Sequence, residues 1–571
     1  MRWSRNWQDQ NINVDRLLNM SESLFSLDLP PLTAASKEFV PILAMVEKGQ
    51  FLEALGALSD LAAKDLSYAK NASLWLNIGF VYTRLALWPQ VIEALQACLQ
   101  IAPNTPDAER LLALAYFSVG RKQQACDLID ASCRRNKHLE MNWMMRAYIH
   151  AHSNSSLSKT LETARDWGRR FADPLTRRAK PFIGRDRDPR RTLKIGYVTA
   201  DFRQHSVAFF LRPILAHHDP AVVDVHVYSN SVVKDEFTAD LRSLVPHWHE
   251  IEKLTDEQVI AQIRRDAIDV LIDLSGFTQG HRLTVFAHRA APVQVTWVGY
   301  MNTLGMKAMD YRMVDATMAP PSHAPYYSEA LFQLNCLATY TPPNYSPLEE
   351  EPPMLRNGYP TLISLNSSSK ITDSMLSVWA KILKARPDAK LIIMVKELES
   401  SAAQAHMQPR AEAAGLPIDR VFVLHQQKLE NFMELGHIAD IQLDTSPISG
   451  GTTTLHASWM GLPIVTMDAV RGVDACTAGM LQTLGVKGEI ARNEDEYVSA
   501  TLRLMNDPER LRQHRLNVRH LMKNSPWMDY SARAKEVEAA YGCMWRNWVR
   551  GDKENLDLKS DKLINNQESM A

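Results

Sequence analysis

A loop near the C-terminal third of the chain holds the residues whose types and spacing point most directly to chemistry. It covers residues 446–451 and ends on two adjacent glycines, Gly450 and Gly451. The residues directly after the loop carry hydroxyl groups: Thr452, Thr453 and Thr454. We predict a short strand over 441–443 before the loop, and apolar residues at helical spacing predict a helix over 452–460 after it.

A strand, a glycine-containing loop and a helix N-terminus can together form an anion-binding site. The first N–H groups of a helix have no partner within the helix, and the helix dipole places partial positive charge at the same end. The threonine hydroxyl groups would add donors, so the site would suit a diphosphate. The residues alone also allow an ordinary strand–loop–helix corner in which Ser or Thr caps the helix.

A second candidate is a histidine pair, His247 and His249, which stands next to Glu250. Two histidines separated by one residue lie on the same face of a strand and could form part of a metal site. No third ligand is evident from the sequence. We therefore interpret this segment as the solvated edge of a sheet and predict no metal ligand.

Two α/β units must position these residues. In the first unit we predict strands at residues 193–198, 223–228, 268–273 and 293–298. In the second we predict strands at residues 362–365, 390–395, 421–424, 441–443 and 463–467. Helices alternate with these strands, which indicates parallel, doubly wound sheets with ligands at the carboxyl ends of the strands. Because His205 follows the first strand, we expect it to face a cleft between the units.

A helical repeat precedes the α/β units. Its clearest copy spans residues 72–105, and the spacing of its small and apolar residues matches the 34-residue tetratricopeptide pattern. A second copy begins at Pro106, and a weaker copy comes before the first. A generic helical bundle is the alternative. Tetratricopeptide repeats would provide an extended surface for a protein partner.

Composition narrows the class of protein. The 571 residues carry a formal net charge of −1, so no broad basic field exists to bind nucleic acid or an anionic membrane. The sequence has no apolar run long enough for a spanning helix and no apolar signal region at its N-terminus. Its six cysteines form no C-x-x-C pair. These features predict a cytoplasmic protein with reduced thiols.

Several segments between residues 193 and 545 form an ordered series of motifs. They are IGYVTADFRQH at 195–205, DLSGFTQG at 273–280, RAAPVQVTWVGY at 289–300, MDY at 309–311, Lys370, and SGGTTTLHASWMG at 449–461. In these motifs the chain resembles the O-linked N-acetylglucosamine transferase family, which is glycosyltransferase family 41. The resemblance is to its SPINDLY-like bacterial members in particular, and it extends to the repeats ahead of the motifs.

The resemblance implies a GT-B fold of two Rossmann-like lobes. It also implies metal-independent transfer of a sugar, N-acetylglucosamine in particular, from a UDP-sugar to a Ser or Thr hydroxyl of a protein. It places His205 in the active site, as a base or a donor-binding residue, and Lys370 against the diphosphate. Residues expected to bind the UDP-sugar are Asp273, Thr278, Gly450, Gly451, Thr452 and Thr453, with His456 at the ribose and Lys428 at the nucleoside.

We divide the chain into segments on these grounds. They are an N-terminal segment (1–34), tetratricopeptide repeats (35–140), a helical and basic linker (141–192), an N-terminal lobe (193–340), a proline-rich linker (341–360), a C-terminal lobe with a closing helix (361–550) and a polar tail (551–571). The expected partners are a UDP-sugar and a protein acceptor held by the repeats. Two alternatives stay open: a GT-B enzyme that acts on a glycan or other non-protein acceptor, and a non-catalytic tetratricopeptide scaffold or sensor.

Overall fold

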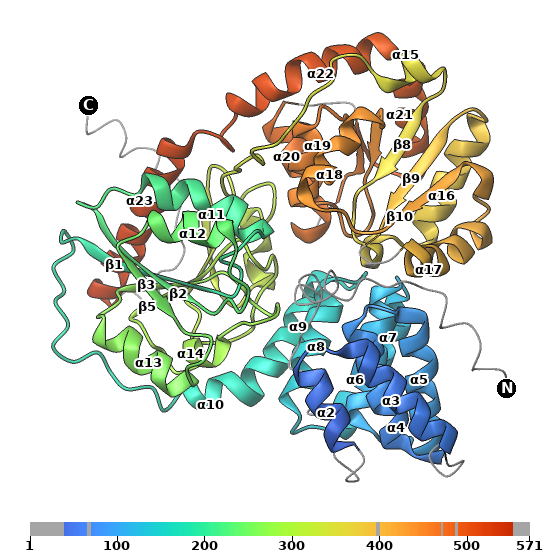
Figure 1. The fold of residues 1–571 in the computed structure, drawn as a ribbon. Coiled ribbons are helices and arrows are strands. Elements are labelled where there is room, and N and C mark those ends of the chain that lie inside the picture. The colour runs from blue at the N-terminus through green and yellow to red at the C-terminus, as the bar shows by residue number, and fades with distance from the viewer. Residues whose placement is uncertain (1–38, 65–69, 396–399, 470–471, 486–488, 552–571) are drawn as a thin grey trace.

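The structure is a computed structural model that describes residues 39–64, 70–395, 400–469, 472–485 and 489–551. Over these residues the chain forms an all-helical N-terminal part followed by two lobes, each with a parallel sheet (Figure 1). We refer to the lobe that contains β1–β7 as the N-lobe and the lobe that contains β8–β13 as the C-lobe. Within the same residues, no helix combines the length and the apolar character needed to cross a membrane.

Short turns join the helices of the N-terminal part. These helices are α2 (Val40–Glu47), α3 (Phe51–Lys64), α4 (Ala72–Arg84), α5 (Trp88–Ile101), α6 (Pro106–Ser118), α7 (Lys122–Arg135), α8 (Glu140–Ala151), α9 (Leu157–Trp167), the π-helical turn η2 (Gly168–Ala172) and α10 (Asp173–Thr176). Helices α4 and α5 approach closely because Gly79 has no side chain: a Cβ there would lie 2.5 Å from Cδ2 of Leu95. The helical pairs α4–α5 and α6–α7 agree with the two clearer copies of the predicted repeat.

The N-lobe sheet has the strand order β3-β2-β1-β4-β5-β6-β7 among the described residues, and each neighbouring pair is parallel. The order reverses between β1 and β4, which opens a crevice at their carboxyl ends. The strands are β1 (Leu193–Thr199), β2 (Val223–Ser229), β3 (His247–Glu250), β4 (Val270–Asp273), β5 (Val293–Thr296), β6 (Tyr311–Asp315) and β7 (Ala330–Leu334). The helices are α11 (Ser206–His217), α12 (Glu236–Ser243), α13 (Asp256–Arg265), α14 (Leu283–Ala287) and the 3-10 helix η3 (Pro321–Tyr326).

The C-lobe repeats this plan. Its described strands follow the order β10-β9-β8-β11-β12-β13, again with parallel neighbours. The strands are β8 (Thr361–Ser364), β9 (Lys390–Met394), β10 (Val421–Leu424), β11 (Ile441–Leu443), β12 (Ile464–Met467) and β13 (Ile490–Ala491). The helices are α16 (Asp373–Ala385), α17 (Ser400–Ala413), α18 (Leu429–Glu434), α19 (Thr452–Trp459), α20 (Gly472–Thr483), α21 (Glu494–Met505) and α22 (Pro508–Lys523), with 3-10 turns η4 (Ser368–Lys370), η5 (Ile418–Arg420) and η6 (Leu435–His437).

The last helix among the described residues returns to the N-lobe. A connection with α15 (Pro353–Asn357) leads from the N-lobe to the C-lobe, and α23 (Tyr530–Arg550) leads back and packs beside α11 (Figure 1). Its Tyr541 hydroxyl shares a hydrogen bond of 3.0 Å with the hydroxyl of Tyr197 on β1. The returning helix therefore ties the two lobes together.

The predicted strands and the α/β class are confirmed, but the sequence did not reveal β6, β7 or the two-residue strand β13. Strand β6 is buried along its whole length and yet contains a charged residue, Arg312, whose guanidinium donates to the Tyr300 carbonyl. Such a residue breaks the apolar run by which buried parallel strands are recognised. Strand β7 is only partly buried, so its pattern is weaker still.

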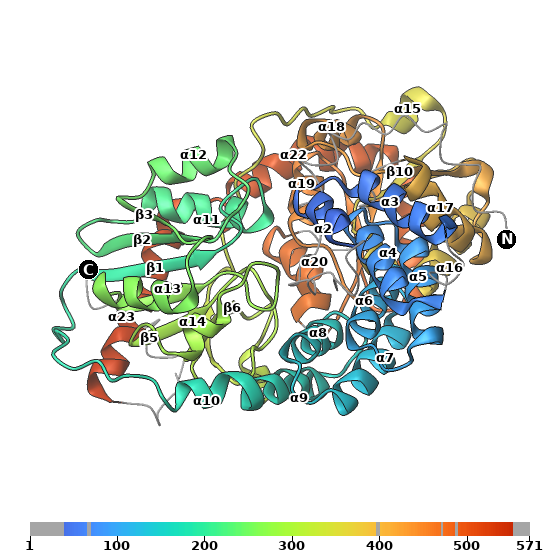
Figure 2. The ribbon, with the colours of Figure 1, turned by 60° about the horizontal axis from the view of Figure 1, so that its bottom comes forward.

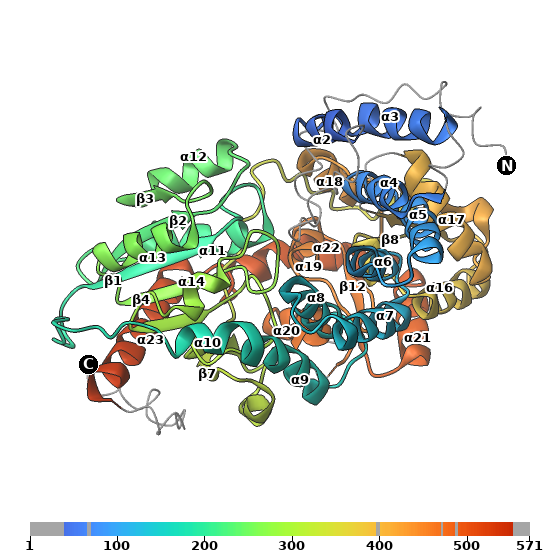
Figure 3. The same ribbon diagram turned by 90° about the horizontal axis from the view of Figure 1, so that it is seen from below.

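The helical part lies along one side of both lobes (Figures 2 and 3). Helix α6 contacts the turn η4 of the C-lobe. On the N-lobe side, the Asn302 amide donates to the Ala151 carbonyl at the end of α8, and the rings of Trp167 and Phe277 pack edge to face. The helical part is therefore packed against the lobes and is not a separate appendage.

Candidate active site

Asp444, the residue after β11, holds the glycine loop of the C-lobe in place. Its buried carboxylate accepts hydrogen bonds from the Gly450 N–H (2.9 Å), the Asn366 amide (2.7 Å) and the Thr466 hydroxyl (2.6 Å). Because three donors converge on one carboxylate, the loop is tied to β8 and β12 as well as to β11. This network positions the loop in front of α19.

The N-terminus of α19 is open toward that loop. Gly451 is the residue before the helix, and no side chain caps the helix there. A Cβ on Gly451 would meet nothing within 4 Å, so there is free space in front of the helix. Thr452 is half-buried, and the Thr453 hydroxyl donates to the Asn366 amide oxygen at 2.9 Å. The unpaired N–H groups of a first helical turn and the helix dipole favour an anion at such a place.

Lys370 brings a cation to the same loop. It ends the turn η4 after β8, and its Nζ donates to the Ser449 carbonyl at 2.6 Å. Burial lowers the pKa of Lys370, while nearby Asp444 acts in the opposite direction and favours the charged form. The structure thus brings the predicted lysine and the predicted glycine loop together, although they lie far apart in the sequence.

His456 lies one helical turn into α19, where the lobes meet. Its ring is buried and contacts aromatic rings from three parts of the chain: Phe209, Tyr340 and Phe432. The Tyr340 hydroxyl and Nδ1 of His456 share a hydrogen bond of 2.7 Å. Burial lowers the pKa of His456 to about 3, so the imidazole is neutral at physiological pH. Contact of His456 with a ribose stays a prediction.

Lys428, the other residue expected near the nucleoside, is exposed. It stands directly before α18, the helix whose Phe432 contacts the ring of His456. Lys428 is therefore the N-cap residue of the helix that packs against His456. Its role in binding the nucleoside also stays a prediction.

His205 is the residue before α11 in the N-lobe. Its Nδ1 accepts a hydrogen bond from the Val207 N–H at 3.3 Å and lies 3.5 Å from Oδ2 of the buried Asp201. The His205 side chain is 35% exposed, so it remains accessible. One turn further along α11, the ring of Phe209 lies 5.3 Å from that of His456. The residues that follow β1 therefore face those of α19 across the junction of the lobes.

Asp273 and Thr278 shape the loop after β4. The buried carboxylate of Asp273 accepts hydrogen bonds from the N–H groups of Ser275 and Gly276 and from the Thr296 hydroxyl. The Thr278 hydroxyl donates to the Ser275 carbonyl at 2.7 Å. Through these hydrogen bonds, both side chains stabilise the conformation of the loop. Direct binding of a UDP-sugar by either residue is not required by this geometry and stays a prediction.

A cavity of about 520 Å³ opens beside Asp201. It lies at the carboxyl ends of β1 and β2 and next to the loop after β4, and the helices α4 and α8 complete its wall. Its charged lining residues are Arg84, Asp201, Arg203, Glu252, Asp256 and Arg282. A cavity of mixed charge between the N-lobe and the helical part is large enough to accept a polar ligand or a short peptide segment.

The fold is that of a GT-B glycosyltransferase. Its two Rossmann-type sheets meet at the carboxyl ends of their strands, and the last described helix returns to the first lobe. The chain belongs to glycosyl transferase family 41, whose family model matches residues 175–339 and 361–537.

Curated and solved relatives agree with this assignment. The chain is 36% identical over 429 residues to a probable UDP-N-acetylglucosamine–peptide N-acetylglucosaminyltransferase SPINDLY from Solanum lycopersicum, a match that covers 74% of this chain and 45% of the relative. It is 24% identical to a UDP-N-acetylglucosamine–peptide N-acetylglucosaminyltransferase from Caenorhabditis elegans, over 66% of this chain and 42% of the relative. The chain thus spans about half the length of the curated relatives that it matches. A mutant of the Thermobaculum terrenum O-GlcNAc transferase superposes with a TM-score of 0.80 at 28% identity, over 91% of this chain and all of that one.

Sequence reasoning missed the residues that organise the site. Asp444 lies two residues before the glycine loop, and an acid directly after a short predicted strand is the signal in the sequence that could have identified it. Asp201 lies within a recognised motif, four residues before His205. Tyr340 and Asn366 carry no local signal, since their partners His456 and Asp444 are distant in the sequence.

Proposed function

We propose that this protein transfers N-acetylglucosamine from UDP-N-acetylglucosamine to Ser or Thr hydroxyl groups of a protein. Membership of family 41 supports sugar transfer, and the names of the relatives support this donor and a peptide acceptor. The observation that carries the proposal is the Lys370 ammonium at the glycine loop, where it donates to the Ser449 carbonyl. Because the relatives are about twice as long, the proposal concerns the reaction and not the range of acceptors.

The C-lobe would stabilise the leaving group. As the bond between the anomeric carbon and the diphosphate oxygen breaks, negative charge develops on the diphosphate. Lys370 and the first N–H groups of α19 would meet that charge, and preorganised donors of this kind lower a barrier without having to reorganise. These groups supply the positive charge that a bound metal ion supplies in other transferases. We therefore propose that the transfer step requires no metal.

The N-lobe would supply the base. The oxygen of the acceptor hydroxyl forms a bond to the anomeric carbon, UDP leaves with the bonding electrons, and the hydroxyl proton passes to an acceptor group. His205 is accessible and has a carboxylate neighbour in Asp201. If Asp201 takes a hydrogen bond from Nδ1, Nε2 of His205 carries the lone pair that can accept this proton. The cavity beside Asp201 would then receive the acceptor segment, partly against the helices α4 and α8 of the N-terminal part.

We also place the protein in the cytoplasm. All six cysteines are free, and five of them are buried, which supports a reducing compartment.

Replacement of Lys370 tests the proposal. We expect Lys370→Ala to lower UDP release from UDP-N-acetylglucosamine by about 100- to 1000-fold, which is the usual effect of removing one donor to a developing anion. Lys381→Ala is the matched control, because Lys381 is an exposed lysine of the same lobe that pairs with Glu494. UDP release is measured with a library of Ser- and Thr-containing peptides, and circular dichroism verifies folding.

The outcome also separates the alternatives. Normal turnover in folded Lys370→Ala would refute the assignment of the site. A wild-type protein that binds UDP but releases none from any UDP-sugar would favour the scaffold. UDP release with oligosaccharides but not with peptides would favour a glycan acceptor.

A further inference from the structure

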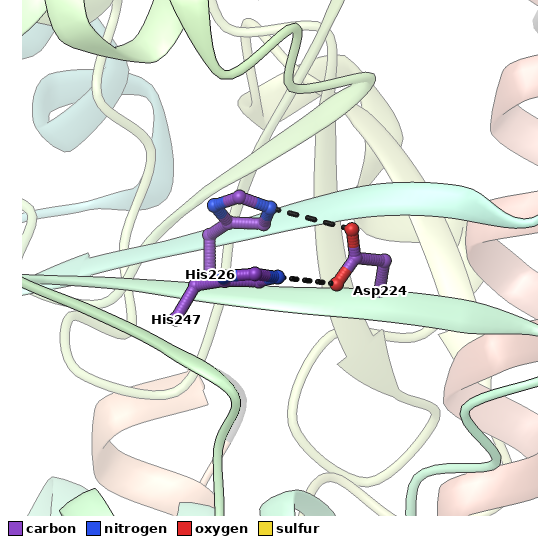
Figure 4. Close-up of side chains that lie close together, drawn as sticks. All are labelled: Asp224, His226 and His247. Carbon is purple, nitrogen blue, oxygen red and sulfur yellow. Dashed lines mark ion pairs between the residues drawn. The ribbon is translucent and has the colours of Figure 1, made fainter.

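A cluster of histidines and aspartates lies in the N-lobe on one face of the edge strand β3 and of its neighbour β2. The register pairs His226 of β2 with His247 of β3, and residues two apart on a strand point to the same face. Asp224 therefore shares the face of His226. The ring nitrogens of both histidines point toward the Asp224 carboxylate (Figure 4). Asp224 and His247 stand at the beginnings of their strands, whereas His205 follows the carboxyl end of β1.

The distances within this cluster fit a single metal ion. Nε2 of His247 lies 3.1 Å from Oδ1 of Asp224, and Nε2 of His226 lies 3.5 Å from Oδ2 of the same carboxylate. Ligands about 2.0–2.1 Å from a tetrahedral zinc ion lie about 3.4 Å from one another. The two imidazole rings stack with centroids 4.2 Å apart, and His247 is 44% exposed, so its ring can turn to share one ion with His226.

A buried nitrogen without a hydrogen bond is the second observation. The side chain of His226 is only 5% exposed, yet its Nε2, the atom aimed at the carboxylate, has no hydrogen-bond partner. A buried polar atom left in this state is costly, and it calls for an explanation such as an ion. A neutral imidazole with a free lone pair is the form that binds a metal.

The other ring nitrogen of His226 is already oriented. Its Nδ1 lies 3.4 Å from Nε2 of His249, so a proton on Nδ1 can be donated to that ring while Nε2 stays free. Metal-binding histidines are commonly held by such an outer hydrogen bond. A second possible group, formed by His226, His249 and Asp266, is less suitable. Oδ2 of Asp266 already accepts a hydrogen bond of 2.7 Å from Tyr228.

We propose that Asp224, His226 and His247 bind one Zn²⁺ ion, with water in the fourth position. Two imidazoles and a carboxylate are typical zinc ligands, and the exposed side of the cluster leaves room for water. Lys194 Nζ lies 3.9 Å from Oδ2 of Asp224, but this lysine is 40% exposed and can turn away into solvent. The ion would pin β3, an edge strand of four residues, to β2. The site is separate from the transfer reaction.

Metal titration of the full chain tests the site. We expect protein freed of metal by chelation to bind one Zn²⁺ per chain by calorimetry, and to give the intense visible absorption of tetrahedral Co²⁺ when cobalt is used instead. His247→Gln should weaken Zn²⁺ binding by about 100-fold or more, whereas the outer His249→Gln should weaken it by about 10-fold. His437→Gln is the matched control, because His437 is a partly exposed histidine of the C-lobe that pairs with a single acid, and it should leave binding unchanged.

Any other result would contradict the proposed zinc site. Failure of folded wild-type protein to bind Zn²⁺, or unchanged binding in His247→Gln, would refute it. A greater loss in His249→Gln than in His247→Gln would assign the ion to the group with Asp266 instead. Since His247 is exposed, its replacement should not prevent folding, and a thermal shift of the wild-type chain by Zn²⁺ that His247→Gln lacks provides an independent measurement. UDP release is measured in parallel, so failure of the zinc site and failure of the proposed transfer are distinguishable.

Discussion

Nδ1 of His205 has two neighbours that favour opposite tautomers. The Val207 N–H donates to a lone pair on Nδ1, whereas the Asp201 carboxylate, 3.5 Å away, would accept a proton from it. Only the second arrangement leaves the lone pair on Nε2, where it can act as a base. The hydrogen bond at the helix start is long at 3.3 Å, so a small rotation of the ring can exchange one partner for the other.

Replacement of each member of this pair tests the role of His205. We expect His205→Ala to lower the transfer rate by about 100-fold or more, since a positioned base contributes at least this much. Asp201→Asn should cause a smaller loss, about 10-fold, because a neutral amide holds the proton on Nδ1 less strongly and cannot stabilise the imidazolium that forms. Transfer kinetics and UDP-sugar affinity are measured for both variants. Affinity should be unchanged if His205 is the base, and a parallel loss of affinity would make it a donor-binding residue.

The neutral state of His456 makes folding sensitive to acid. Its pKa is about 3 in the folded chain and 6.5 in an unfolded one, so the unfolded state binds more protons between these values and stability falls as pH falls. From pH 7.5 to 5.5 this group alone should reduce the free energy of unfolding by about 1.4 kcal/mol. Urea unfolding at both pH values should show that His456→Gln loses about that much less than the wild type. An equal loss in both proteins would contradict the assignment.

At the scale of elements, local sequence patterns predicted where the strands lie in the chain but not their order in the sheets. Buried strands such as β1 and β9 are apolar runs between turns, and their positions could be predicted to within a residue or two. The loop after β11 and the lysine Lys370 were recognised separately. Their contact, Lys370 to the Ser449 carbonyl, joins residues 79 positions apart and depends on the strand order β8–β11. No local pattern contains that order, so the site could be predicted as parts but not as an assembly.

The contact between α9 and the N-lobe depends on a glycine, Gly305, at the point where the two approach most closely. Gly305 has a positive φ of 72°, and a Cβ there would overlap the backbone of Ala164 in α9. We expect Gly305→Ala to destabilise the chain by about 3 kcal/mol, from backbone strain and from separation of the two elements. Gly415→Ala is the matched control: its φ is 83°, but a Cβ would meet nothing within 4 Å, so strain alone should cost about 1 kcal/mol. Urea unfolding compares them, and equal losses would show that the contact adds nothing.

At the scale of the whole molecule, the helical part reaches the proposed donor site in the C-lobe as well as the N-lobe. The turn between α6 and α7 lies against the C-lobe, where a Cβ on Gly120 would lie 2.7 Å from the carbonyl oxygen of Ile371, the residue after Lys370. Arg410 fixes the same carbonyl with a hydrogen bond of 2.7 Å. Lys122 in α7 is near enough for the charges of Lys370 and Arg410 to lower its pKa, although burial is the larger cause. The sequence predicted a partner-binding surface here, and it could not predict that the surface also borders the lysine.

This arrangement predicts that the repeats affect binding of the nucleotide and not only of a protein acceptor. In Gly120→Ala the new methyl group should push the α6–α7 turn away from Ile371, displace Lys370 and weaken UDP binding several-fold. Gly358→Ala controls for backbone strain, because Gly358 in the C-lobe has a similar φ of 77° against 79° for Gly120, and a Cβ there would have no neighbour within 4 Å. UDP affinity is measured by calorimetry. If both variants bind UDP as the wild type does, the helical part packs on the C-lobe without influencing the site. A loss of affinity confined to Gly120→Ala would mean that binding of an acceptor to the repeats can affect the proposed donor site through this turn.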